Sequence, residues 1–246
     1  MNMDLSEYVS AGYYLSRYAG FHDCTGIELR RVTMACEHSQ RKFFPGTWAL
    51  SWCNDDDETR IAEAAHFGIG QEQLPGVIAW ADDAFDRAFG AWNVFFRLED
   101  AREAANRFLQ QASDVELWGL GLHRSFLTEF TRTSAPPPSS PGYAPTGACG
   151  MHIAACRISN PLEAGGMRLG HEVLIGQDGQ GFNSPESRHL DECAMVEAVG
   201  IKTNEHGLID RFEDAMACCK HLDSHAAETQ HQITGWRPWL IVRYPI

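Results

Sequence analysis

The segment RFEDAMACCKHLDSH, residues 211–225, places two adjacent cysteines and two histidines within fifteen residues. Thiolates and imidazoles are ligands that zinc prefers in proteins. If the segment is helical, the spacings between Cys218, His221 and His225 put these side chains on successive turns of one side. The three residues are therefore a candidate metal site, with His231 as a candidate fourth ligand.

The same segment has a second interpretation, because its apolar residues also recur with the period of a helix. This apolar face comprises Phe212, Ala215, Met216, Cys219 and Leu222. It predicts that Cys219 packs in the core, while His221 and His225 lie at the edge of the face or in water. On this interpretation the segment binds no metal.

Other catalytic patterns are few. His22 and Cys24 flank Asp23 and could form an activated thiol, although neighbours in sequence do not establish the geometry of a catalytic triad. The chain has no C-x-x-C, no G-x-S-x-G, no H-E-x-x-H and no phosphate-binding P-loop. No cofactor is predicted, and the enzyme hypothesis is a small metal-dependent or thiol enzyme that uses Cys218, His221 and His225, or His22 and Cys24.

The charge balance points to a different class of function. The chain has 33 acidic and 20 basic residues, a net charge of −13. This charge repels nucleic acid and anionic membranes and attracts basic proteins. The acidic run Asp55, Asp56, Asp57 and Glu58 is the predicted contact for such a partner, together with one or more exposed tryptophans. The alternative is that the run only solvates a turn or begins a helix.

The sequence also predicts where the protein resides. No apolar run approaches the roughly 20 residues that span a bilayer, and the start of the chain does not resemble a signal peptide. The eight cysteines are spread along a chain of ordinary domain size, which favours reduced thiols. We therefore expect a cytoplasmic protein.

The pattern of helices and strands predicts an α+β fold, with a mixed or antiparallel sheet and helices packed on it. Periodicity predicts helices over 5–19, 98–111 and about 212–222. Apolar runs predict strands, at 27–34, 47–53, 115–122, 151–158, 171–176 and 239–244. A segment rich in Pro, Ser and Gly, 133–150, is predicted to be a loop or linker between an N-terminal region, 1–132, and a C-terminal region, 151–246. The two regions can also pack as one domain.

Two helix starts resemble each other. RLEDA, residues 97–101, has a near copy in RFEDA, residues 211–215, and a looser one in WADDA, residues 80–84. In the first two cases an apolar helix face is followed by a predicted strand, which suggests two related helix–strand units. Either an internal duplication or two independent uses of favourable helix-start chemistry explains the likeness.

Four segments resemble the characteristic segments of small acidic bacterial cytosolic proteins. They are NPLEAGGMRLGHEVLIG (160–176), GFNS (181–184), GIKTNEHGLIDRFEDA (200–215) and WRPWLIVRY (236–244). Similar proteins occur as immunity partners of secreted or contact-delivered toxins, so the resemblance implies a protein that binds and occludes a cognate toxin. It implies no catalytic residues. Ser184, Pro185 and Glu186 stand where a tryptophan, a cysteine and an asparagine would be expected, which puts in doubt any role of that stretch.

Overall fold

A computed structural model describes part of the chain. The described residues are 5–18, 41–45, 57–84, 88, 95–112, 114–127, 161–177, 181–183, 199–225 and 235–246. The strands predicted at 27–34, 47–53 and 151–158 lie outside them, as does the proposed linker at 133–150.

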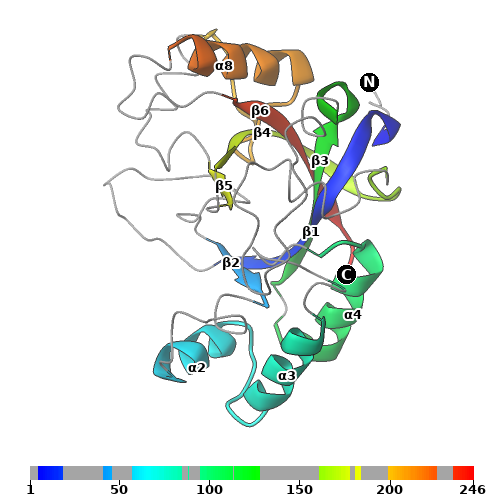
Figure 1. Cartoon of the computed structure of the whole chain (residues 1–246), viewed down its shortest axis with the longest axis vertical. Helices are drawn as coiled ribbons and strands as arrows, with labels where there is room; N and C mark the ends of the chain where they lie inside the picture. The colour runs from blue at the N-terminus through cyan, green and yellow to red at the C-terminus, as the bar shows by residue number, and fades with distance from the viewer. Residues whose placement is uncertain are drawn as a thin grey trace, which may run out of the picture. The chain divides into compact units, whose positions relative to one another are not determined.

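The described strands form one six-stranded sheet (Figure 1). Its order is β2-β1-β3-β6-β4-β5. The strands are β1 (Tyr8–Tyr18), β2 (Arg41–Phe44), β3 (Glu116–His123), β4 (Met167–Gln177), β5 (Gly181–Asn183) and β6 (Arg237–Tyr244). The pairs β1–β2 and β4–β5 are antiparallel, with Leu15 opposite Phe44 and Ile175 opposite Asn183.

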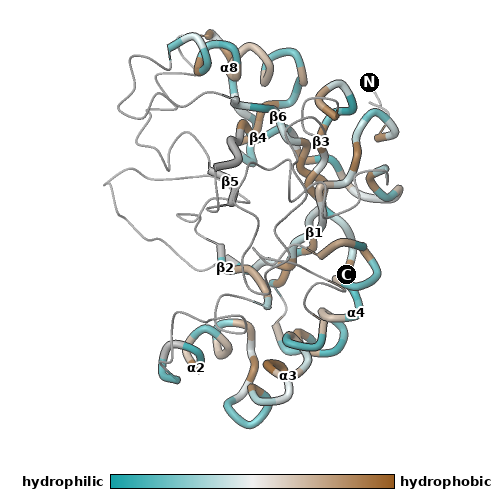
Figure 2. Tube along the Cα trace, in the orientation of Figure 1, coloured by the Kyte–Doolittle hydropathy of each residue, from teal (hydrophilic) through white to brown (hydrophobic). Residues whose placement is uncertain are grey.

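Four α-helices accompany the sheet in the described part of the chain, which confirms the predicted α+β class. They are α2 (Asp57–His66), α3 (Leu74–Ala84), α4 (Leu98–Phe108) and α8 (Phe212–Ser224), and the short 3-10 helices are η1 (Leu5–Glu7) and η3 (Arg124–Phe126). The helices show both hydrophilic and hydrophobic stretches (Figure 2), as expected for elements with one buried face. The predicted order of helix and then strand is present twice, as α4 with β3 and as α8 with β6.

The predicted helix over 5–19 is wrong, because most of this segment is strand β1. All residues from Tyr8 to Ser16 are buried. A strand that is covered on both faces loses the alternation of polar and apolar residues that identifies strands in a sequence. The looser copy WADDA also differs from its expected role, since it lies at the end of α3 and not at a helix start.

The chain divides into two compact units. The first comprises Met1–Ala11, Asp23–Ser39 and Leu120–Val242, and the second Gly12–His22, Gln40–Gly119 and Arg243–Ile246. Strands β1, β3 and β6 contribute residues to both units. In the first unit α8 contributes Ala215, Cys218, Cys219 and Leu222 to a core. The other members of this core are Val173, Ile209 and Trp236.

Candidate functional site

Acidic side chains gather along α2, α3 and the turn that joins them. Residues 57–84 contain six acidic residues and one basic residue. Asp57 and Glu58 are in the first turn of α2, while Asp82 and Asp83 are in the last turn of α3. These four residues are exposed, as is Glu72 before α3. We call Asp57, Glu58, Glu72, Asp82 and Asp83 the acidic group.

The acidic residues lie at the favourable end of the helix dipole in α2 and at the unfavourable end in α3. The acidic first turn of α2 is stabilising, because it lies at the positive end of the helix dipole and near unpaired backbone N–H groups. In α3 the acidic residues lie at the negative end, and its last turn contains no basic residue. The positions of Asp82 and Asp83 are therefore unfavourable with respect to the dipole of their own helix.

Aromatic packing holds the acidic helices in the second unit. The ring of Phe44 on β2 lies 5.7 Å from that of Phe67, which follows α2, and stacks at 6.0 Å on Trp80 of α3. Trp80 also lies 4.9 Å from Phe108 of α4. The exposed carboxylates thus stand on helices whose opposite sides are part of a core.

Arg17 on β1 fixes the end of α2. Its guanidinium donates a hydrogen bond to the carbonyl oxygen of His66, and its Nε lies 2.6 Å from Oδ1 of Asp114. The hydrogen bond from Arg17 lowers the pKa of Asp114. Burial, followed by the positive charges of Arg17 and Lys42, lowers the pKa of His66.

The predicted acidic contact is only partly within the described chain. Asp57 and Glu58 belong to it and are exposed, whereas Asp55 and Asp56 lie outside the described residues. Asp57 lies 3.7 Å from Nη1 of Arg60 and keeps 85% of its side chain exposed. Glu72, Asp82 and Asp83 were not predicted as part of this contact, although the excess of acidic residues over 57–84 is visible in the sequence.

The expected exposed tryptophans are not found among the described ones. Trp118, Trp236 and Trp239 are buried, and Trp80 is half-buried against its aromatic neighbours. The remaining tryptophans, Trp48, Trp52 and Trp92, lie outside the described residues.

The three candidate metal ligands on α8 do not converge on one point. Cys218 is fully buried in the core beside Cys219, whereas His225 is exposed and His221 is half-buried. The two imidazoles contact each other, with ring centroids 4.2 Å apart, and Nδ1 of His225 lies 2.8 Å from the carbonyl oxygen of His221. Within the described residues, no group of three His, Cys, Asp or Glu side chains could hold a metal ion. His22, Cys24 and His231 lie outside those residues.

Both cysteines of α8 are packing residues in the described core. Only Cys219 was predicted on the apolar face, but Cys218 is equally buried. Burial raises the pKa of the Cys219 thiol well above its usual value, and the neighbouring Cys218 adds to this effect. A thiol in this environment is a poor nucleophile, because the reactive form is the thiolate.

A buried Tyr–His pair in the first unit was not anticipated from the sequence. The hydroxyl of Tyr8 lies 2.9 Å from Nε2 of His171, and Nδ1 of His171 lies 3.1 Å from the carbonyl oxygen of Ile209. Since a carbonyl only accepts, Nδ1–H donates to it and the hydroxyl of Tyr8 donates to Nε2. Both ring nitrogens of a neutral His171 therefore have a partner.

Burial governs the protonation of this pair. It lowers the pKa of His171 to about 4, with a further contribution from the positive charge of Arg168. Burial also raises the pKa of Tyr8. Around the pair, His123 at the end of β3 stacks on Phe212 at 4.4 Å and meets the ring of Tyr8 edge-on at 5.3 Å. Burial therefore favours the neutral forms of Tyr8 and His171, and aromatic rings pack around them.

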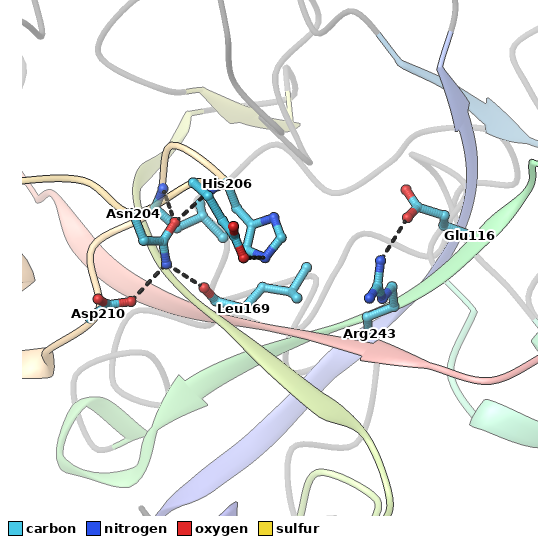
Figure 3. A network of polar contacts seen from close by, with 8 residues as sticks. Glu116, Leu169, Asn204, His206, Asp210 and Arg243 are labelled. Atoms are coloured by element: carbon cyan, nitrogen blue, oxygen red, sulfur yellow. Dashed lines mark hydrogen bonds and ion pairs between the residues drawn. The ribbon is translucent and has the colours of Figure 1, made fainter. Parts of the chain in front are cut away.

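The loop that leads into α8 is closed by Asn204 (Figure 3). Its Nδ2 donates to the carbonyl oxygen of Leu169 and to Oδ1 of Asp210, both at 2.7 Å. Its Oδ1 accepts from the backbone N–H groups of His206 at 2.9 Å and Leu208 at 3.1 Å. One side chain therefore ties this loop to β4 and sets the approach to the helix.

Comparisons with family models, with curated proteins and with solved structures each gave no match. In the part of the chain that the structure describes, no helix has the length and apolar character needed to cross a membrane.

Proposed function

We propose that the protein is a cytoplasmic binding protein of the immunity type, which recognises a basic protein, a cognate bacterial toxin, and occludes it. The partner is a protein and not nucleic acid or a membrane, because the net charge of −13 repels polyanions. The acidic group on α2 and α3 is the proposed contact, together with Asp55 and Asp56.

The observation that carries this proposal is the placement of Asp82 and Asp83. They are exposed at the end of α3, where the helix dipole disfavours negative charge. Exposed negative charge at this position attracts a positively charged partner. Long-range attraction of this kind raises the association rate and weakens as salt screens the charges.

The proposal is tested with two charge-matched variants of the full chain. In the first, Glu58→Gln, Glu72→Gln, Asp82→Asn and Asp83→Asn remove four charges from the acidic group. In the second, Glu103→Gln, Glu163→Gln, Glu205→Gln and Glu213→Gln remove four exposed charges elsewhere. Asp57 is kept in both variants. Wild-type protein and both variants are immobilised and exposed to lysate of the source cells, and retained proteins are eluted with increasing salt and identified by mass spectrometry.

We expect a basic protein to be retained by the wild type and by the second variant, and to elute from the first variant at lower salt. That protein should be toxic when produced alone and harmless when produced together with the wild-type chain. Equal retention by both variants would remove the acidic group from the interface. A retained protein whose toxicity is unaffected by co-production would contradict the immunity function.

A further inference from the structure

The two halves of the sheet have the same arrangement of strands, counted from opposite edges. Its first half has the order β2-β1-β3 and its second half, counted from the opposite edge, the order β5-β4-β6. In each half an 11-residue strand, β1 or β4, pairs antiparallel with a short strand, β2 or β5. An 8-residue strand, β3 or β6, completes each half. The two halves therefore share their strand order and the lengths of their two longer strands, while the short strands have four and three residues.

Each long strand forms an isolated antiparallel bridge with the segment that precedes a helix. In β1, Tyr13 forms an isolated antiparallel bridge with Phe95, through N–H···O bonds of 2.9 and 2.8 Å. In β4, His171 forms such a bridge with Ile209, through bonds of 2.7 and 2.9 Å. In both strands the residue just before the bridge is a glycine with positive φ, Gly12 at +121° and Gly170 at +140°.

The helices begin at the same distance from these bridges. Arg97 follows Phe95 by two residues and is the N-cap of α4, while Arg211 follows Ile209 by two residues and is the N-cap of α8. Both caps are extended and lack a side-chain cap. Each arginine pairs with the glutamate two residues later, at 3.1 Å for Glu99 and 3.6 Å for Glu213.

Buried positions and a helix end also correspond. Ala101 and Ala215, each four residues after the N-cap, have 0% exposure. Upstream, α2 is followed by Phe67 and then by Gly68 with φ +74° and Ile69, while the helical residue Val199 is followed directly by Gly200 with φ +70° and Ile201. The dipeptide Gly-Ile thus ends a helix in both halves.

We infer that the chain is an internal duplication, in which β1, β2, α4 and β3 form one copy and β4, β5, α8 and β6 form the other. Favourable helix-start chemistry explains the paired arginines and acidic residues. It does not explain a bridge two residues before each cap, a positive-φ glycine within each long strand, or the mirrored strand order. A common ancestor for the two copies explains all of these features together.

The copies differ in one large element. Between Ile69 and Phe95 the first copy has 25 residues, which include α3, whereas seven residues lie between Ile201 and Ile209 in the second. Residues 199–209 are all described, and they contain no counterpart of α3. The helix that bears Asp82 and Asp83 therefore has no equivalent between Ile201 and Ile209 of the second copy.

Hydrogen exchange of the full chain tests the inference. Equivalent bridges predict slow exchange at four backbone amides, those of Tyr13, Phe95, His171 and Ile209. Gly12→Ala forces a side chain into a positive-φ conformation, and it should speed exchange at Tyr13 and Phe95 at least tenfold. Gly170→Ala should do the same at His171 and Ile209.

The matched control is Gly76→Ala on α3, since a Cβ at this position meets no atom within 4 Å. It should leave exchange at all four amides unchanged. Protection of one bridge but not the other in the wild-type protein would overturn the inference, and this measurement needs no variant to fold. An effect of one glycine substitution on its bridge, with no effect of the other on its own, would also contradict the equivalence.

Discussion

The hydroxyl of Tyr8 and the imidazole of His171 are 2.9 Å apart although 163 residues separate them in the chain. The pair joins β1 to β4 within the first unit. Because the imidazole also donates to the carbonyl oxygen of Ile209, it links both strands to the residue that precedes α8 by three positions. The same contact gives this protein a defined response to acid.

Stability should fall in mild acid because His171 is held neutral. Its pKa is lowered from 6.5 to about 4 in the folded state, so the unfolded chain binds the proton more readily between these values. The contribution is present above pH 6.5 and is lost as the pH falls towards 4, by up to about 3 kcal/mol. Urea unfolding of the wild type and of His171→Gln, measured from pH 7.5 to 4.5, should give curves that converge as the pH falls. Parallel curves would show that His171 does not titrate in this range.

Tyr8→Phe should destabilise the protein by about 1–3 kcal/mol at pH 7.5, because it leaves Nε2 of His171 buried without a donor. In a double-mutant cycle with His171→Phe, the two losses should not add, since either substitution alone removes the hydrogen bond. Additive losses, measured by urea unfolding, would mean that the two side chains act independently.

Removing the charges of Asp55, Asp56, Asp57 and Glu58 should slow association with the partner. The fourfold variant, with Asn and Gln at these positions, should also show a weaker dependence of its association rate on salt. Thermal stability should fall only slightly, because the first turn of α2 loses carboxylates that interact favourably with the helix dipole. Stopped-flow association with the isolated partner at low and physiological salt measures both effects. An unchanged association rate would remove this run from the interface.

Cys218→Ala should leave the zinc content of the purified protein unchanged while lowering its stability by about 1–2 kcal/mol. The side chain is fully buried in the core and its substitution leaves a cavity. Inductively coupled plasma mass spectrometry gives the metal content, and urea unfolding gives the stability. Equimolar zinc in the wild type that disappears in this variant would revive the metal-dependent enzyme hypothesis.

Asn204→Ala should destabilise the loop before α8 by about 1–3 kcal/mol, since it removes a donor and an acceptor that serve four hydrogen bonds. Asn204→Asp keeps the acceptor but places a second carboxylate near Asp210, so it should be no better tolerated at neutral pH. Hydrogen exchange at His206 and Leu208 locates the effect. Unchanged exchange at both amides in Asn204→Ala would show that the loop closes without this side chain.

Local periodicity was sufficient to predict much of the regular structure. The helices over 98–111 and 212–222 and the strands over 115–122, 171–176 and 239–244 are present with small differences at their ends. Amphipathic helices and continuous apolar runs carry their structure in residues that are near neighbours, which is why a single sequence reveals them. The repeated helix starts were visible for the same reason.

The tertiary structure alone decided the remaining features. The segment 5–19 reads as a helix but is strand β1, because its residues are covered on both sides by parts of the chain that are distant in sequence. The orientation of α8 about its own axis places Cys218 in the core and leaves His225 exposed to solvent. The Tyr8–His171 pair and the bridges at Tyr13 and His171 depend on how strands pair, and such pairing is set by packing between distant segments and not by local propensity.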